Sequence, residues 1–200
     1  MYEHRFTRED PDNSYLPSCT GTVITTMTVG ASKRRALLYM PESARACTVA
    51  VTVLPPDGWT CERALEQGTW RRLADEEETR DGFAIMCREP ENGGKWRLDG
   101  APGDQEGEAA YVSAAISQVL GGCKFIHADI ARFGLIGFGE GGTAAQMAAM
   151  EQPAGISSIV SVGAAPVRES FARAAGDAIC KKPCFFAYPV PELGIRNLSI

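Results

Sequence analysis

The chain has 200 residues, 44% of them hydrophobic and 22% charged, a balance typical of one soluble globular domain with a sizeable core. Its formal net charge of −5 disfavours a nucleic-acid partner, because binding phosphates needs a basic face. Apolar runs fall well short of the ~20 residues that cross a bilayer, and the polar start of the chain lacks a signal-peptide core, so we expect a cytoplasmic protein with no membrane partner.

Four strands are predicted in the first half of the chain by runs of β-branched and apolar residues, and they cover residues 22–29, 35–40, 48–54 and 83–87. Residues 1–20 precede them as an irregular lead-in. The first two strands are expected to form an antiparallel hairpin. Thr60 is the expected N-cap of a helix that runs to about residue 78. Residues 89–107 are polar and glycine-rich, and a loop of that length in a compact domain is often functional.

The second half of the chain alternates helices with strands. The predicted helices cover residues 108–120, 143–150 and 167–179, and the predicted strands cover residues 132–136, 156–162 and 184–188. A hairpin followed by this alternation predicts a single α/β domain over residues 1–200, a three-layer α/β/α sandwich with a mainly parallel sheet. No helix is expected after the last strand.

A glycine-rich turn joins one of these strands to the helix that follows it, and it reads Gly137-Phe138-Gly139-Glu140-Gly141-Gly142. It fits two motifs. The first is G-x-G-x-x-G (Gly137, Gly139 and Gly142), which binds a dinucleotide through backbone N–H groups at a helix N-terminus. That fingerprint opens its fold, whereas several strands come first here, and the next strand does not end in the acidic residue that would hold a ribose. Glu140 would also place negative charge beside the pyrophosphate.

The second motif is the nucleophile elbow, G-x-S-x-G, with Gly139 in place of the nucleophilic serine. An elbow needs small residues two positions before and two positions after the nucleophile, so that strand and helix can approach each other. Gly137 and Gly141 meet that need. The central residue of an elbow has a backbone conformation that glycine adopts readily and other residues disfavour. The elbow therefore accounts for more of the turn than the dinucleotide fingerprint does.

Segments between residues 35 and 166 follow one another in the order RALLYMPE, VAVTVLPPDGWT, GFAIMCREP, EAAYVSAAISQVL, ADIARFGLIGFGEGGTAAQMAAM and GISSIVSVGAA. In this order they resemble the α/β-hydrolases, particularly the branch of polyhydroxybutyrate depolymerases and feruloyl esterases. The resemblance implies an α/β-hydrolase-like fold. It also implies carboxylic-ester hydrolysis through an acyl-enzyme as the ancestral chemistry, without a cofactor.

The nucleophile and the oxyanion hole of that family are altered in this sequence. Gly139 has no hydroxyl to attack a carbonyl. The loop after residue 54 would carry a His-Gly motif in the family, but here it reads PPDG, and proline has no N–H to donate. The backbone N–H groups of Gly58, Trp59 and Glu140 remain as candidate donors to an oxyanion.

The acid and the histidine of a catalytic triad are also missing from their expected places. The two histidines, His4 and His127, both precede the turn, whereas the catalytic histidine of this fold follows it. We therefore predict a poor or inactive esterase whose fold is incomplete at the C-terminus, without its last strand and helix. Either a natural pseudoenzyme or a portion of a longer hydrolase-like protein would explain this pattern. An engineered change of a serine to Gly139 would explain neither the prolines nor the missing histidine.

A non-catalytic binding or assembly module on the same fold is the alternative function. Its pocket would lie at the carboxyl ends of the strands, near residues 58–59, 89–107 and 137–142. The candidate side chains for a small-molecule ester or a hydrophobic ligand are Asp57, Trp59, Trp96, Phe138 and Glu140. An exposed sheet edge after Tyr188 would favour strand pairing between two copies, which predicts a homo-oligomer.

The seven cysteines are scattered and form no C-x-x-C motif, which predicts buried free thiols in a reducing compartment. With only two histidines in the chain, no metal site is expected. Cys61 lies at the predicted start of a helix, where a thiolate would be stabilised. It is therefore a further candidate nucleophile, although a half-buried helix residue is the simpler interpretation.

Overall fold

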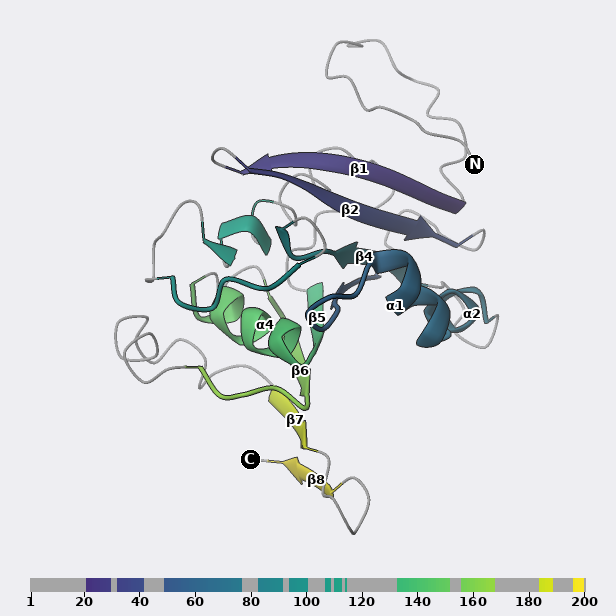
Figure 1. Cartoon of the computed structure of the whole chain (residues 1–200). Coiled ribbons are helices and arrows are strands. Elements are labelled where there is room, and N and C mark those ends of the chain that lie inside the picture. The colour runs from purple at the N-terminus through teal and green to yellow at the C-terminus, as the bar shows by residue number, and fades with distance from the viewer. Residues whose placement is uncertain are drawn as a thin grey trace.

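The computed structural model describes residues 21–29, 32–41, 49–76, 83–91, 94–100, 107–108, 110–112, 114, 133–151, 156–167, 184–188 and 196–199. These residues form one eight-stranded sheet with helices packed against it (Figure 1). The strands are β1 (Gly21–Val29), β2 (Ser32–Met40), β3 (Val49–Leu54), β4 (Phe83–Arg88), β5 (Phe133–Phe138), β6 (Ser158–Val162), β7 (Cys184–Tyr188) and β8 (Arg196–Ser199).

The sheet has the strand order β1-β2-β4-β3-β5-β6-β7-β8. Its centre, from β4 to β7, is parallel, and the hairpin of β1 and β2 joins it by an antiparallel pairing between β2 and β4. The predicted parallel sheet with a hairpin at one edge is therefore confirmed. Parallel strands place their carboxyl ends at one edge of the sheet, so the loops after β3, β4, β5 and β6 meet there.

The expectation of no further strand after residue 188 is wrong. β8 pairs with β7 in the antiparallel sense, with Tyr188 opposite Arg196. The free edge expected after Tyr188 is consequently covered, because the outer backbone groups of β7 find their partners in β8. RNLS has neither an apolar run nor an alternating pattern, and for that reason it did not indicate a strand.

The single helix expected after Thr60 is instead two short helices, α1 (Cys61–Gln67) and α2 (Trp70–Asp75). Thr60 is the N-cap, as predicted, and its hydroxyl accepts a hydrogen bond from the N–H of Arg63. The interruption falls at Gly68 and Thr69. Glycine is a poor helix former, and the N–H of Gly68 caps α1 by donating to Ala64. Thr69 has a left-handed backbone with φ of 53°.

Two apolar clusters lie on opposite faces of the sheet. On β4, Ala84 and Met86 belong to the cluster beneath the helix α4 (Glu140–Glu151), whereas Ile85 and Cys87 belong to the cluster beneath α1 and α2. Both faces of β4 are thus buried, which explains the uninterrupted apolar run in its sequence. The three-layer arrangement predicted from the sequence follows from this division (Figure 1).

The remaining predicted helices are described only in part. Residues Glu108, Ala110, Tyr111, Val112 and Ala114 are helical, in agreement with the prediction for residues 108–120. The predicted helix over residues 167–179 lies almost wholly outside the described residues, as do the lead-in over residues 1–20 and both histidines. In the part of the chain that the structure describes, no helix is long and apolar enough to pass through a membrane.

Candidate functional site

The glycine-rich turn is tighter than the sequence suggested. β5 continues to Phe138, and α4 begins at Glu140, so only Gly139 lies between strand and helix. Gly139 has a left-handed backbone with φ of 53°. Its N–H donates to the carbonyl oxygen of Val162 at the end of β6, at 2.9 Å, and its own carbonyl oxygen accepts from the N–H of Gly142 at 3.0 Å. The turn is therefore fixed at the carboxyl edge of the parallel strands.

Three glycines of this turn have no room for a side chain: Gly137, Gly141, and Gly142, whose Cβ would lie 2.6 Å from the Cβ of Ala164. A Cβ on Gly137 would lie 2.4 Å from the carbonyl oxygen of Gly141 and from the Cα of Gly142. A Cβ on Gly141 would lie 2.4 Å from the carbonyl oxygen of Leu54. Both contacts are with backbone atoms, which cannot move aside as a flexible side chain can. The predicted need for small residues on either side of position 139 is confirmed.

Position 139 itself is less crowded. A Cβ on Gly139 would lie 3.3 Å from the Cβ of Pro56, in the loop that follows β3. A small side chain would therefore need Pro56 to shift by a few tenths of an ångström. The positive φ adds a separate cost for any residue with a Cβ. Glycine adopts the backbone of position 139 without strain, whereas a residue with a Cβ would be strained there and would contact Pro56.

The candidate oxyanion donors differ in what they contact. The N–H of Gly58 donates to the carbonyl oxygen of Gly94 at 2.8 Å, and the N–H of Trp59 donates to that of Pro56 at 3.2 Å. Neither points freely into a site in this conformation. Glu140, by contrast, is in the first turn of α4, where N–H groups have no partner within their own helix. Its side chain is exposed.

The structure brings Asp57 and Trp96 together. The backbone N–H of Trp96 donates to Oδ1 of Asp57 at 2.9 Å, and its indole N–H donates to the carbonyl oxygen of Pro55 at 2.8 Å. Trp96 is only 5% exposed and belongs to the apolar cluster on the α4 face. It therefore fixes the loop after β3 from within the core and does not line an open surface.

The aromatic candidates Trp59 and Phe138 lie on the other face of the sheet. Both are partly buried against the cluster beneath α1 and α2. The guanidinium of Arg63 lies 4.2 Å from the centre of the Trp59 ring. The ring of Phe138 meets that of Trp70 edge to face, with 6.3 Å between centroids. Trp59 and Phe138 consequently do not share a surface with Trp96.

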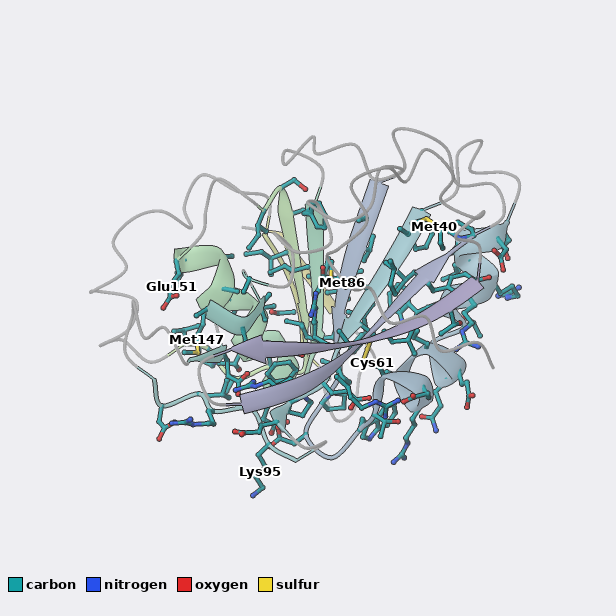
Figure 2. All side chains as sticks on the ribbon, turned by 90° about the horizontal axis from the view of Figure 1, so that it is seen from above. Met40, Cys61, Met86, Lys95, Met147 and Glu151 are labelled. Carbon is teal, nitrogen blue, oxygen red and sulfur yellow. A yellow bond between two sulfur atoms is a disulfide. The ribbon has the colours of Figure 1, made fainter. Side chains whose placement is uncertain are left out.

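Cys61 is not a free thiol. It forms a disulfide with Cys87 near the end of β4, with 5.6 Å between the two Cα atoms. Figure 2 labels Cys61 and draws its sulfur in yellow. The predictions of free thiols and of a reactive Cys61 are wrong for this pair, because the fold brings the first residue of α1 against β4. A disulfide sulfur is no nucleophilic thiolate. The spacing of the cysteines along the chain carried no signal of this pairing.

A carboxylate also contacts the start of α1. Oε1 of Glu89 accepts a hydrogen bond from the N–H of Cys61 at 2.9 Å. Burial raises the pKa of Glu89, and the hydrogen bond from Cys61 opposes that shift. Disulfide and carboxylate together attach α1 to the end of β4, one strand away from the loop over Gly139.

A buried ionic cluster, which the sequence analysis did not predict, lies beside β2 and β4. Arg34 forms an ion pair with Glu108, and both side chains are almost wholly excluded from solvent. The guanidinium groups of Arg34 and Arg88 lie 4.5 Å and 5.6 Å from the centre of the Tyr111 ring. The signal in the sequence is limited to Arg34, just before the apolar run of β2, and Arg88, just after that of β4.

Burial governs the protonation of this cluster. It raises the pKa of Glu108, against the influence of the N–H of Arg97 and the charge of Arg34. It also raises the pKa of Tyr111 and lowers the pKa of Arg88 to about 10. With a pKa of about 10, Arg88 still carries its charge at neutral pH. Among the residues described, no group of three or more His, Cys, Asp or Glu side chains could hold a metal ion.

No family model matches the sequence, and no curated protein matches it either. Solved structures do resemble it. A ferulic acid esterase superimposes with a TM-score of 0.57 at 14% identity, over 72% of this chain and 58% of its own. An acetyl xylan esterase from Aspergillus awamori gives 0.62 at 12% identity, over 76% and 56%. An S-formylglutathione hydrolase from Agrobacterium tumefaciens gives 0.56 at 21% identity, over 72% and 57%. The chain thus spans a little over half the length of each of these structures.

Proposed function

The chain has the α/β-hydrolase fold, and from this premise we propose that it is an esterase-like protein in which ester hydrolysis is impaired at Gly139. The observation that carries the proposal is the position of Gly139. It stands alone between β5 and α4, with a positive φ, at the carboxyl edge of the parallel strands. A nucleophile elbow places its catalytic serine at such a turn. Glycine keeps the backbone and lacks the hydroxyl.

Loss of the nucleophile removes the acyl-enzyme route. What remains of a serine hydrolase without it is binding and oxyanion stabilisation, which give roughly 10³-fold over water. The hydrogen bonds of Gly58 and Trp59 to other backbone groups reduce even this contribution. The N–H of Glu140 is the remaining donor that could face a ligand oxygen. The working function is therefore to hold a small ester or apolar ligand without rapid turnover.

The dinucleotide alternative has less support. In a G-x-G-x-x-G turn, backbone N–H groups approach the pyrophosphate. Here the N–H of Gly139 donates to Val162 and that of Gly142 donates to Gly139. A titration with NAD, followed by tryptophan fluorescence, should accordingly stay flat. Quenching that saturates would revive this alternative.

The disulfide bears on the location. The Cys61–Cys87 disulfide counts against the expected cytoplasmic location, because disulfides favour an oxidising compartment. We therefore propose that the protein folds in an oxidising compartment.

The experiment is hydrolysis of 4-nitrophenyl butyrate by the unchanged chain, Gly139→Ser and Gly139→Ala. The alanine variant is the matched control, because it adds the Cβ without the hydroxyl. We expect the unchanged chain and Gly139→Ala to stay near the buffer rate. A gain confined to Gly139→Ser would show that the rest of the site survives, and no gain would leave binding as the function. Rapid hydrolysis by the unchanged chain would overturn the proposal.

A further inference from the structure

Two segments far apart in the sequence contact each other, and the first of them reaches Gly139 through Pro56. The first, here called the cover loop, is residues 55–59, which follow β3. The second, here called the strap, is residues 94–97. Lys95 in the strap points away from the molecule (Figure 2), whereas its neighbour Trp96 is buried in the core. The strap therefore has one side in solvent and the other against the cover loop.

Three hydrogen bonds join strap and cover loop. The N–H of Gly58 donates to the carbonyl oxygen of Gly94 at 2.8 Å. The N–H of Trp96 donates to Oδ1 of Asp57 at 2.9 Å, and its indole N–H donates to the carbonyl oxygen of Pro55 at 2.8 Å. Of these acceptors only Asp57 uses a side chain. Its replacement can therefore remove one contact without changing the backbone.

The strap is itself held from the other side. Oε1 of Glu108 accepts from the N–H of Arg97 at 3.0 Å. Glu108 is fixed in turn by its buried ion pair with Arg34. The strap is thus tied to the interior at Arg97 and by the ring of Trp96, and it presents the carbonyl of Gly94 to the cover loop.

Because the cover loop is hydrogen-bonded to the strap, the strap also fixes the position of Pro56 beside the turn. Pro56 is the residue that a Cβ on Gly139 would meet, at 3.3 Å. Two positions further on, Gly58 has φ of 72°, and its N–H is directed to the strap. The same arrangement thus sets Pro56 over Gly139 and occupies a donor that a ligand oxygen would otherwise use.

We propose that the strap latches the cover loop shut over Gly139, with Asp57 and Trp96 as the positioning residues of the latch. Loss of the Asp57–Trp96 contact releases both segments together and frees the N–H of Gly58. The inference rests on the proposed function only in taking Gly139 as the centre of the site. The latch itself is a property of the described hydrogen bonds.

Amide hydrogen exchange, resolved by residue, tests the latch in the full chain, Asp57→Ala and Asp57→Asn. Asparagine keeps an acceptor oxygen and serves as the matched control. In Asp57→Ala, a latch predicts exchange about 10-fold faster or more at both Gly58 and Trp96, with little change at Leu135 in β5. In Asp57→Asn, exchange at these amides should stay close to that of the unchanged chain.

Three results would overturn the latch. Exchange could rise at Trp96 and not at Gly58, which would make the contacts independent. It could rise equally at Leu135, which would make Asp57 a contributor to global stability alone. It could also stay unchanged at Gly58 and Trp96.

A kinetic readout separates the latch from the proposed function. In the Gly139→Ser background, adding Asp57→Ala should lower the KM for 4-nitrophenyl butyrate with little change in kcat, because a larger fraction of the protein is open. An unchanged KM beside faster exchange at Gly58 would overturn the latch as a barrier to ligand. If neither variant hydrolyses the ester, the rest of the catalytic site is not functional in this chain, and exchange alone decides the latch.

Discussion

Arg34 on β2 and Glu108, 74 residues apart in the sequence, form an ion pair whose side chains are 1% and 0% exposed. Glu108→Gln leaves the guanidinium of Arg34 buried without its counter-charge, and this should lower the free energy of unfolding by about 3–5 kcal/mol. The exposed pair of Arg35 and Glu62 is the matched control, and Glu62→Gln should cost less than about 1 kcal/mol. Urea unfolding measures both. Equal costs would mean that burial adds nothing to the Arg34 pair.

The Cys61–Cys87 disulfide closes a loop across a sequence separation of 26 residues. Replacing both cysteines by alanine should lower the free energy of unfolding by about 3–4 kcal/mol, because the open chain gains conformational freedom in the unfolded state. Mass spectrometry without reductant should find the two peptides linked, and urea unfolding gives the stability. Alkylation of both thiols in unreduced, unfolded protein would contradict the bond.

Gly137 and Gly139 should differ sharply in their tolerance of a methyl group. Gly137→Ala drives a Cβ to within 2.4 Å of backbone atoms, and this overpacking should cost about 3 kcal/mol or more. Gly139→Ala meets only the side chain of Pro56, at 3.3 Å. With its positive φ it should cost roughly 1–2 kcal/mol. Thermal unfolding of both variants checks the order, and the reverse order would refute the packing described at the turn.

Thr52 on β3 is fully buried, and its hydroxyl has no hydrogen-bond partner within the described part of the chain. Thr52→Val keeps the shape and removes the unsatisfied group, so it should raise the free energy of unfolding by about 1 kcal/mol. Thr143→Val is the matched control, because its hydroxyl donates to the carbonyl oxygen of Ala165 at 2.7 Å. That variant should lose about 1 kcal/mol. Destabilisation by Thr52→Val in urea would show that the hydroxyl has a partner.

Glu89 should make the folded state less stable as pH rises. Burial raises its pKa in the folded state, so its favourable contribution is complete below the unfolded pKa of ~4.3 and is lost as pH rises through the higher folded pKa. Glu89→Gln cannot ionise but still offers an oxygen to the N–H of Cys61. Its stability relative to the unchanged chain should therefore improve from about pH 4 to pH 7. Urea unfolding across this range tests it, and a constant difference would mean that the pKa of Glu89 is not raised.

Local patterns in the sequence sufficed for most of the fold. The apolar runs of β3 and β4 record burial on both faces, and Thr60 marks a helix start by its own hydroxyl. The sequence predicts one helix in place of α1 and α2, because the helical pattern continues through Gly68. The backbone nevertheless leaves the helical conformation at Thr69. β8 was missed because its polar residues are ordered by pairing with β7, which no local pattern encodes.

In the candidate site too, local features were predictable from the sequence and contacts between distant segments were not. Gly137, Gly139 and Gly141 were identified from their spacing, because a sharp strand-to-helix turn imposes its demands on adjacent residues. The Cys61–Cys87 bond and the Arg34–Glu108 pair depend on which strands and helices become neighbours. Trp96 is a candidate for ligand binding from the sequence, but the hydrogen bond of its indole N–H to Pro55 lets it enter the core.

The strand order also has a consequence for how the chain folds. β1 and β2 pair across a short turn, so their contacts are local. β3 and β5 are neighbours at the centre of the sheet. Ala50 of β3 pairs with Phe133 of β5, although residues 51–132 separate the two in the sequence. Closing so long a loop costs entropy before any contact compensates for it, and such topologies fold slowly. The hairpin can form early, whereas Pro56 reaches its place beside the turn at Gly139 only when the two halves of the chain have met.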